Sequence, residues 1–65
     1  MTTKIHFIGG DTLTVTEGPE AVLAVRRAAG GDAIRLTSGR GEVLVNGDAI
    51  TYWHEDWKHG GGGLN

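Results

Sequence analysis

Residues 4–16 read KIHFIGGDTLTVT and predict a β-hairpin. Polar and apolar side chains alternate on both sides of the glycines, which is typical of strands that bury one face. We expect strands at residues 4–8 and 12–16, joined by the three-residue loop Gly9-Gly10-Asp11. An odd loop length keeps the apolar residues of the two strands on one face. The inward-facing pairs are then Phe7 with Leu13 and Ile5 with Val15.

Gly18-Pro19-Glu20 predicts the start of a helix that ends near Ala29 and is followed by Gly30. Proline is favoured at the first helical position, a carboxylate stabilises the positive end of the helix dipole, and glycine is a common stop. Val22 and Val25 begin an apolar stripe along one side. A helix of about three turns is unstable alone, so we expect it to dock on the sheet.

Residues 33–37 and 42–45 predict a second pair of strands around the two-residue turn Gly39-Arg40. A glycine at the first central position is what a type II′ turn requires. The inward-facing residues of this pair of strands are Ile34, Leu36, Val43 and Val45.

Asn46-Gly47-Asp48 predicts a further hairpin, because Asn-Gly is the strongest short signal for one. It leads into a fifth strand at residues 49–55. Two-residue loops at 46-47 and at 47-48 are both open, and either one places Ile50 and Tyr52 on the face of the inward valines.

The expected fold class is α+β, a single small domain with the element order ββαβββ, in which a mostly antiparallel sheet carries one helix on one face. The compact domain covers residues 1–56. Residues 57–65 contain four successive glycines, and we expect them to form a flexible tail. The strand order and the number of subunits are left open.

The composition predicts a thin core and excludes several classes of protein. A chain of this size buries only roughly 60% of its unfolded surface, and without cysteine it has no disulfide to compensate. Six basic against eight acidic residues give a net charge of −2, which argues against binding to duplex nucleic acid. No apolar run is long enough to span a membrane, and the first residues lack a secretion signal. We expect a cytoplasmic location, or the virion if a phage encodes the chain.

The sheet face that one helix leaves uncovered is the most informative feature for function. Alternation places Ile8, Leu44 and Trp53 on this face beside Arg35, a mixture too apolar for a fully solvated surface. Exposed apolar patches mark interaction sites, and Trp and Arg are frequent interface anchors. We expect an interface with a second copy or another protein here, to which unpaired sheet edges would add. In the alternative, the last strand twists and Trp53 folds over an edge of the thin core, which leaves nothing for a partner.

Histidines and carboxylates near the end of the chain suggest a metal site, but their spacing argues against one. His54, Glu55, Asp56 and His59 lie within six residues of one another. Adjacent residues on a strand point to opposite faces, and the HExxH pattern is missing. We expect no metal and no cofactor. We also expect no enzymatic activity, since cysteine is missing and the one serine, Ser38, lies in a predicted turn.

The arginines offer an alternative function, that of a small regulator which binds nucleic acid or a nucleotide. Arg35 and Arg40, with Arg26 and Arg27 from the helix, would form a basic strip near the aromatic side chains of the fifth strand. Arginines in the last turn of a helix also complement its dipole, which is the simpler interpretation.

Four segments together resemble small uncharacterised proteins of actinobacteria and their phages. They are FIGGDTL at 7–13, GPE at 18–20, VLVN at 43–46 and ITYW at 50–53. The resemblance implies a cytoplasmic, non-enzymatic accessory, and a phage origin adds structural components and host-directed inhibitors. The expected function is therefore a non-catalytic protein–protein interaction module, most simply a homo-oligomer.

Overall fold

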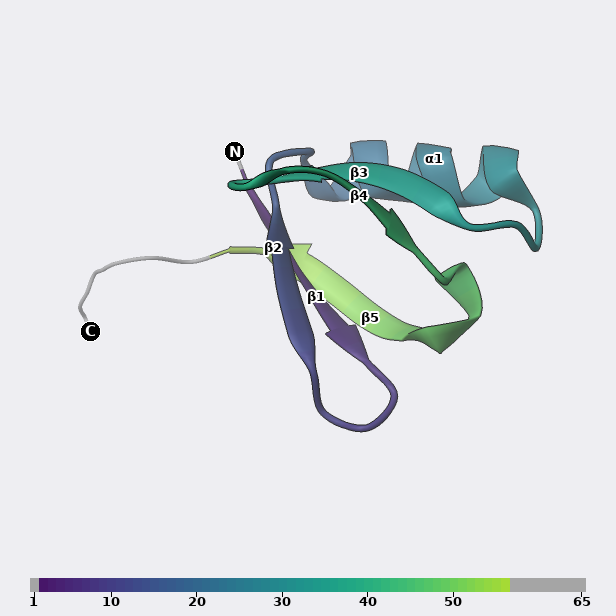
Figure 1. Ribbon diagram of the computed structural model, residues 1–65, viewed down its shortest axis with the longest axis horizontal. Coiled ribbons are helices and arrows are strands. Elements are labelled where there is room, and N and C mark those ends of the chain that lie inside the picture. The colour runs from purple at the N-terminus through teal and green to yellow at the C-terminus, as the bar shows by residue number, and fades with distance from the viewer. Residues whose placement is uncertain (1, 57–65) are drawn as a thin grey trace.

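The computed structural model describes residues 2–56, which form one five-stranded antiparallel sheet and one helix (Figure 1). The predicted α+β class and the order ββαβββ are confirmed. The predicted flexible tail at 57–65 lies outside the described residues. In chain order the elements are β1 (Thr3–Phe7), β2 (Thr12–Val15), α1 (Pro19–Ala29), β3 (Ile34–Ser38), β4 (Gly41–Val45), a 3₁₀ turn (Gly47–Ala49) and β5 (Ile50–Glu55).

The sheet is strongly curled. Its strand order is β4-β3-β2-β1-β5, so β4 and β5 are the two edges, although only residues 46–49 connect them. The edge strands of a flat five-stranded sheet lie about 19 Å apart, at about 4.8 Å per strand. A compact 3₁₀ turn does not span that distance, so the sheet bends. Within residues 2–56, β2 and β3 share the single pair Val15–Ser38, and this pair is the corner between a β2-β1-β5 wall and a β3-β4 wall.

The first hairpin keeps the predicted faces but not the predicted register. Ile5 pairs with Leu13, two residues away from its predicted partner Val15, and Val15 pairs with Thr3. The Phe7 N–H donates to the Asp11 carbonyl over 2.9 Å, so the loop is residues 8–10. Both glycines of this loop have φ of 99°, which only glycine adopts readily. A shift of two residues leaves every side chain on its predicted face, but it moves Ile8 from the strand into the loop.

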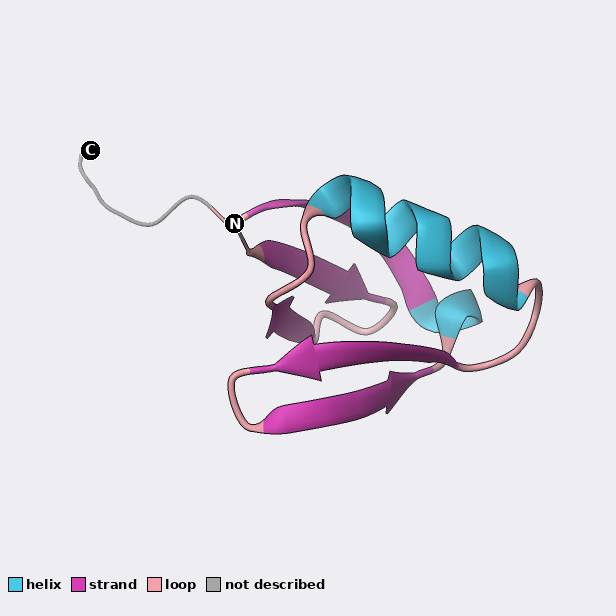
Figure 2. Ribbon diagram, turned by 90° about the horizontal axis from the view of Figure 1, so that it is seen from above, coloured by secondary structure: helices cyan, strands magenta, loops and turns pink. Residues whose placement is uncertain are grey.

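Helix α1 has the predicted bounds and covers one face of the sheet (Figure 2). Pro19 is at the start of the helix, and the Val22 N–H donates to the Gly18 carbonyl over 3.0 Å. Val22 is fully buried, and Val25 and Ala29 pack against the core from the same side. The apolar stripe predicted from the sequence is therefore the contact surface of the helix.

The second hairpin has the predicted register and loop length, but its turn type is different. Ile34 pairs with Val45, and Ser38 pairs with Gly41 across the loop Gly39-Arg40. The predicted type II′ turn is wrong, because the positive φ of 124° falls on Gly41 and not on Gly39. The Ser38 hydroxyl accepts from the Arg40 N–H over 3.2 Å and donates to the Gly41 carbonyl over 2.9 Å. These local side-chain bonds hold a turn in which the residue after the loop needs the left-handed conformation.

The predicted hairpin at Asn46-Gly47 is wrong. Residues 47–49 form a 3₁₀ turn, in which the Asn46 side chain accepts from the Asp48 N–H over 3.0 Å. An asparagine in this position satisfies a backbone donor without closing a hairpin. Across the described residues β5 is therefore not the neighbour of β4, and it pairs with β1 at the far edge of the sheet.

A β-bulge in the pairing of β5 with β1 changes which side chains of β5 face the core. His6 pairs with Tyr52 and Phe7 with Ile50, which leaves Thr51 as the extra residue. The Thr51 hydroxyl donates to the His6 carbonyl over 3.0 Å. Ile50 is buried, whereas Tyr52 is 56% exposed, so the prediction that both share the inner face is wrong. A bulge of one residue reverses the alternation beyond it.

The core is small, as the composition predicts. One polar residue, Thr3, is buried with it among the described residues, and its hydroxyl donates to the Glu17 carbonyl over 2.6 Å. The buried apolar residues of the described chain are Ile5, Val15, Val22, Ile34, Leu36, Val45 and Ile50.

Candidate functional site

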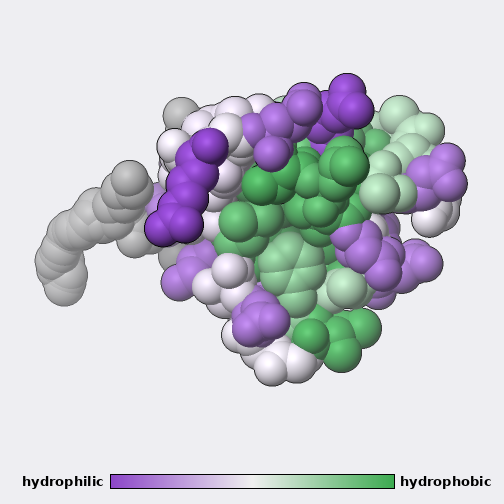
Figure 3. Space-filling view, viewed as in Figure 1, coloured by the Kyte–Doolittle hydropathy of each residue, from purple (hydrophilic) through white to green (hydrophobic). Residues whose placement is uncertain are grey.

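The site with most potential for function is an open apolar groove between the first hairpin and the end of β4. Its volume is about 450 Å³. In Figure 3 this side of the molecule carries a continuous hydrophobic area framed by polar residues. The residues that line the groove are Phe7, Ile8, Asp11, Leu13, Leu44, Val45, Asn46 and Ala49.

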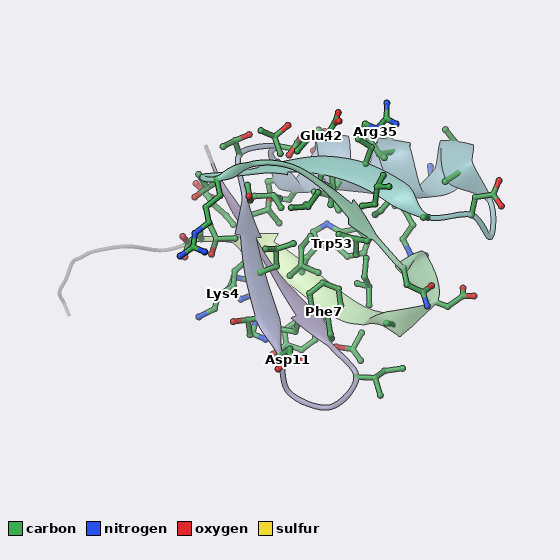
Figure 4. The ribbon with its side chains drawn as sticks, viewed as in Figure 1. Lys4, Phe7, Asp11, Arg35, Glu42 and Trp53 are labelled. Atoms are coloured by element: carbon green, nitrogen blue, oxygen red, sulfur yellow. The ribbon has the colours of Figure 1, made fainter. Side chains whose placement is uncertain are left out.

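The groove exists because the curled sheet does not close. Beyond the Val15–Ser38 pair β2 diverges from β3, and this exposes apolar residues that a closed sheet would bury. Phe7 and Leu13 form the floor, half-buried and packed against the core cluster. Figure 4 shows Phe7 in the space between β2 and β4. The floor of the groove is thus an uncovered side of the core.

Two large apolar side chains stand at the rim of the groove. Ile8 is 69% exposed at the tip of the first hairpin, and Leu44 is 68% exposed on β4. A single exposed apolar residue is ordinary, but two that flank an apolar depression form a continuous patch. Such patches mark interaction sites on small proteins.

The structure brings together two of the four residues predicted for the interface. Ile8 and Leu44 both line the groove. Trp53 does not share their surface, because its indole N–H donates to the Pro19 carbonyl over 2.9 Å and its ring packs against the core. The predicted outward position of Trp53 is therefore wrong, and its ring packs on the core as the alternative predicts. The cause is the bulge at Thr51, which turns Trp53 inward.

Arg35, the fourth predicted interface residue, lies beside the groove but does not line it. It is exposed opposite Leu44 in the β3–β4 pairing. Its Nε atom is 3.4 Å from a carboxylate oxygen of Glu42, and both side chains are more than 60% exposed (68% and 62%; Figure 4). An ion pair this exposed contributes little to stability.

Sequence reasoning missed the role of Phe7 and Leu13. Both were assigned to the inner face, which is correct, but the assignment of a face does not show that the sheet opens over them. The feature that indicates an open sheet is the short connection 46–49 between the two edge strands. It can be recognised only once the strand order is known.

The basic strip of the nucleic-acid alternative draws on residues from separate elements of the fold. Arg26 and Arg27 lie at the end of α1, Arg35 lies on β3, and Arg40 follows β3. Tyr52 is on the outer face of the other wall, whereas Trp53 is turned toward the core. Trp53 is therefore not an exposed ring beside the arginines, and the nucleic-acid function stays a prediction.

Among the carboxylates of residues 2–56, Glu17 is the one with a shifted pKa, and it has a structural role. Burial by itself would raise its pKa, but the hydrogen bonds that the carboxylate accepts, first from the Thr37 N–H at 2.9 Å, outweigh this effect and lower the pKa. The bond joins the segment before α1 to β3 near the corner of the sheet. Glu17 thus stabilises the curl and has no position in the groove.

The metal cluster considered in the sequence is not formed by the residues that the structure describes. No group of three or more histidine, cysteine, aspartate or glutamate side chains in residues 2–56 could hold a metal ion. His59 lies outside these residues. No helix in the same range is long and apolar enough to cross a membrane.

Comparison with known proteins adds no family. The chain matches no protein-family model, none of the curated proteins and none of the solved structures with which it was compared. The resemblance to small proteins of actinobacteria and their phages therefore stays a prediction.

Proposed function

We propose that the chain is a non-catalytic protein-interaction module that self-associates through the apolar groove. The observation that carries the proposal is the pairing of two exposed side chains, Ile8 and Leu44, with a floor of half-buried core residues, Phe7 and Leu13. The small core gains apolar contacts when another chain covers this floor.

A second copy of the chain fits the groove because the patch contains both a projection and a depression. In a two-fold symmetric dimer the same patch faces itself, so each projection meets the depression of the partner. Ile8 stands at the tip of the first hairpin and is the projection best placed to enter the groove of the partner. Among the described residues that line the groove, Asp11 is the only charged one, so few charges oppose this contact.

A small apolar ligand fits the same groove less well. Ligand sites enclose most of their ligand and fix it with a few placed polar groups. Here the side chains that would form the walls project into solvent, since Ile8 and Leu44 are 69% and 68% exposed. The groove therefore suits a surface larger than itself.

The exposed apolar area supports a weak to moderate affinity. Burying a large aliphatic side chain is worth about 1.5–3 kcal/mol, so the two-thirds that are exposed on four such side chains in a dimer give about 4–8 kcal/mol. Association itself costs about 4–15 kcal/mol, which the covered floor and backbone contacts must help to offset. The exposed rim alone therefore supports a dissociation constant of about 1 mM at best, equivalent to about 4 kcal/mol, and a micromolar constant requires about 4 kcal/mol more from the floor and the backbone contacts.

Sedimentation velocity from micromolar to millimolar chain concentration tests the proposal. The wild-type chain should change from monomer to dimer, and the double variant Ile8→Ser/Leu44→Ser should remain monomeric at every concentration. Tyr52→Ser is the matched control, because Tyr52 is a large residue, 56% exposed, outside the groove. If the control variant dissociates and the groove variant does not, the groove is not the interface.

The finer parts of the proposal rest on the sequence. They are a cytoplasmic location, or the virion for a phage-encoded chain, and a role as a structural accessory or a host-directed inhibitor. Fractionation of the native host, followed by detection of the chain in cytosol, membrane and particle fractions, separates these locations.

A further inference from the structure

A cluster of imidazole rings lies on the outer face of the β2-β1-β5 wall, away from the groove. His6 of β1 stacks on Tyr52 of β5, with ring centroids 4.2 Å apart and ring planes inclined by 8°. His54 lies on the same face of β5, opposite Lys4. The Nε2 atoms of His6 and His54 are 2.9 Å apart, and we call these two residues the histidine pair.

The hydrogen bonds of the histidine pair determine which ring nitrogens carry protons. The Nδ1 atom of His54 is 2.7 Å from the Glu55 carbonyl oxygen, which can only accept a hydrogen bond. Nδ1 of His54 is therefore protonated, and in the neutral ring its Nε2 atom carries a lone pair. The Nε2–H of His6 then donates to this lone pair. If His6 takes the other neutral tautomer, the Nε2 atoms of both rings carry a lone pair and lie within reach of one ion.

The separation of the two nitrogen atoms matches adjacent ligands of a metal ion. Imidazole nitrogen binds divalent first-row metals at about 2.0–2.1 Å. Two such ligands at a right angle are about 2.9 Å apart, whereas a tetrahedral angle requires about 3.3 Å. Square-planar geometry with nitrogen and oxygen ligands is typical of Cu²⁺ and Ni²⁺. The observed 2.9 Å is the length of the hydrogen bond between the two rings, and it is short enough for both nitrogen atoms to bind one ion at adjacent positions.

Both rings are held in place by contacts that do not involve the bound position. Tyr52 stacks on His6, and the Glu55 carbonyl holds Nδ1 of His54. Metal-binding histidines typically donate their second N–H to a carbonyl or carboxylate in this way, which fixes the orientation of the ring. The two rings therefore lose less rotational freedom when they bind a metal ion.

One positive charge on this face opposes a bound cation. Lys4 lies directly opposite His54 in the pairing of β1 with β5 and projects outward (Figure 4).

We propose that the histidine pair is a surface site for Cu²⁺, with Ni²⁺ bound more weakly by the same two nitrogen atoms. Cu²⁺ forms the most stable complexes of the divalent first-row series with such ligands. Among residues 2–56, no third histidine or carboxylate completes the set. The site is independent of the groove and of the proposed self-association.

Calorimetric titration of the full chain with Ni²⁺ and electron paramagnetic resonance with Cu²⁺ test the site. We expect stoichiometric binding and a spectrum with two nitrogen couplings. His6→Gln and His54→Gln should each weaken binding at least tenfold, while far-ultraviolet circular dichroism confirms that each variant is folded. Lys4→Gln, which keeps both ligands and removes the opposing charge, should strengthen binding a few-fold.

His59→Gln is the matched control, since it removes the third histidine of the chain and leaves the pair intact. Its affinity should equal that of the wild type. Equal affinity of His6→Gln and the wild type would overturn the proposal. A loss in His59→Gln as large as that in His54→Gln would overturn it as well.

Discussion

Replacing Trp53 by phenylalanine removes the hydrogen bond that joins the end of the sheet to the start of the helix. The indole N–H donates to the Pro19 carbonyl over 2.9 Å. That carbonyl is in the first turn of α1, where it also accepts from the helix backbone, so the variant leaves no buried acceptor unpaired. The bond itself contributes about 0.5–1.5 kcal/mol. The smaller ring gives up about 0.5 kcal/mol of apolar burial at about 25 cal/mol per Å².

The sum for Trp53→Phe is a loss of about 1–2 kcal/mol, which lowers Tm by about 4–16 °C in a domain of this size. Thermal and urea unfolding followed by circular dichroism measure it. Tyr52→Phe is the matched control, because it removes a hydroxyl from an exposed neighbour on the same strand. Its stability should change by less than about 0.5 kcal/mol. If the two variants have equal stability, Trp53 is not anchored to the helix, and the inward assignment of its ring fails.

Three further changes test the turns and titratable groups. Gly41→Ala should destabilise the chain by about 1 kcal/mol in urea unfolding. A Cβ atom would meet no neighbour at this position, but alanine rarely adopts the φ of 124° that Gly41 has. An unchanged midpoint of urea unfolding would contradict the turn geometry. Glu17 has a lowered pKa, so the stability it contributes is present above its unfolded pKa of about 4.3 and is lost as the pH falls through the folded value. Glu17→Gln should lack this dependence in acid unfolding curves. His6 also has a lowered pKa, so on acidification the unfolded chain binds a proton at this residue before the folded chain does. The free energy of unfolding should therefore fall as the pH drops below about 6.5. His6→Gln should flatten this part of the curve of stability against pH, and an identical slope in the variant would contradict the lowered pKa of His6.

Local patterns in the sequence predict the elements of this fold well. The bounds of α1 follow from Pro19 and from the glycine after Ala29, and the structure has the same bounds. Alternation assigns the first four strands to their faces, because side-chain direction depends on the strand alone. Even the two-residue error in the register of the first hairpin leaves these faces unchanged.

Features that depend on distant partners could not be predicted. Asn46-Gly47 is compatible with a hairpin and with a 3₁₀ turn, and the choice depends on whether β5 finds its partner in β4 or in β1. The bulge at Thr51 is equally invisible in the sequence, because it arises in the pairing of β5 with β1. Its effect is large, since it moves Trp53 to the core and Tyr52 to the surface.

The candidate sites show the same contrast between local patterns, which could be predicted, and contacts with distant strands, which could not. Ile8 and Leu44 were predicted as interface residues, and the structure places both at the groove. The reasoning behind that prediction was partly wrong, because Ile8 reaches the groove from a loop and not from a strand face. His6 and His54 were missed as a pair because 48 residues separate them, and no spacing rule applies across two strands of unknown order.

Mapping of backbone amide signals by NMR at increasing chain concentration tests the central claim most directly. If copies of the chain associate through the groove, the concentration-dependent shifts should fall within residues 7–13 and 44–49, the two segments that contain its lining residues. Amides near Tyr52 on the outer face of β5 should not move. Shifts confined to that outer face, or spectra that do not change with concentration, would contradict self-association through the groove.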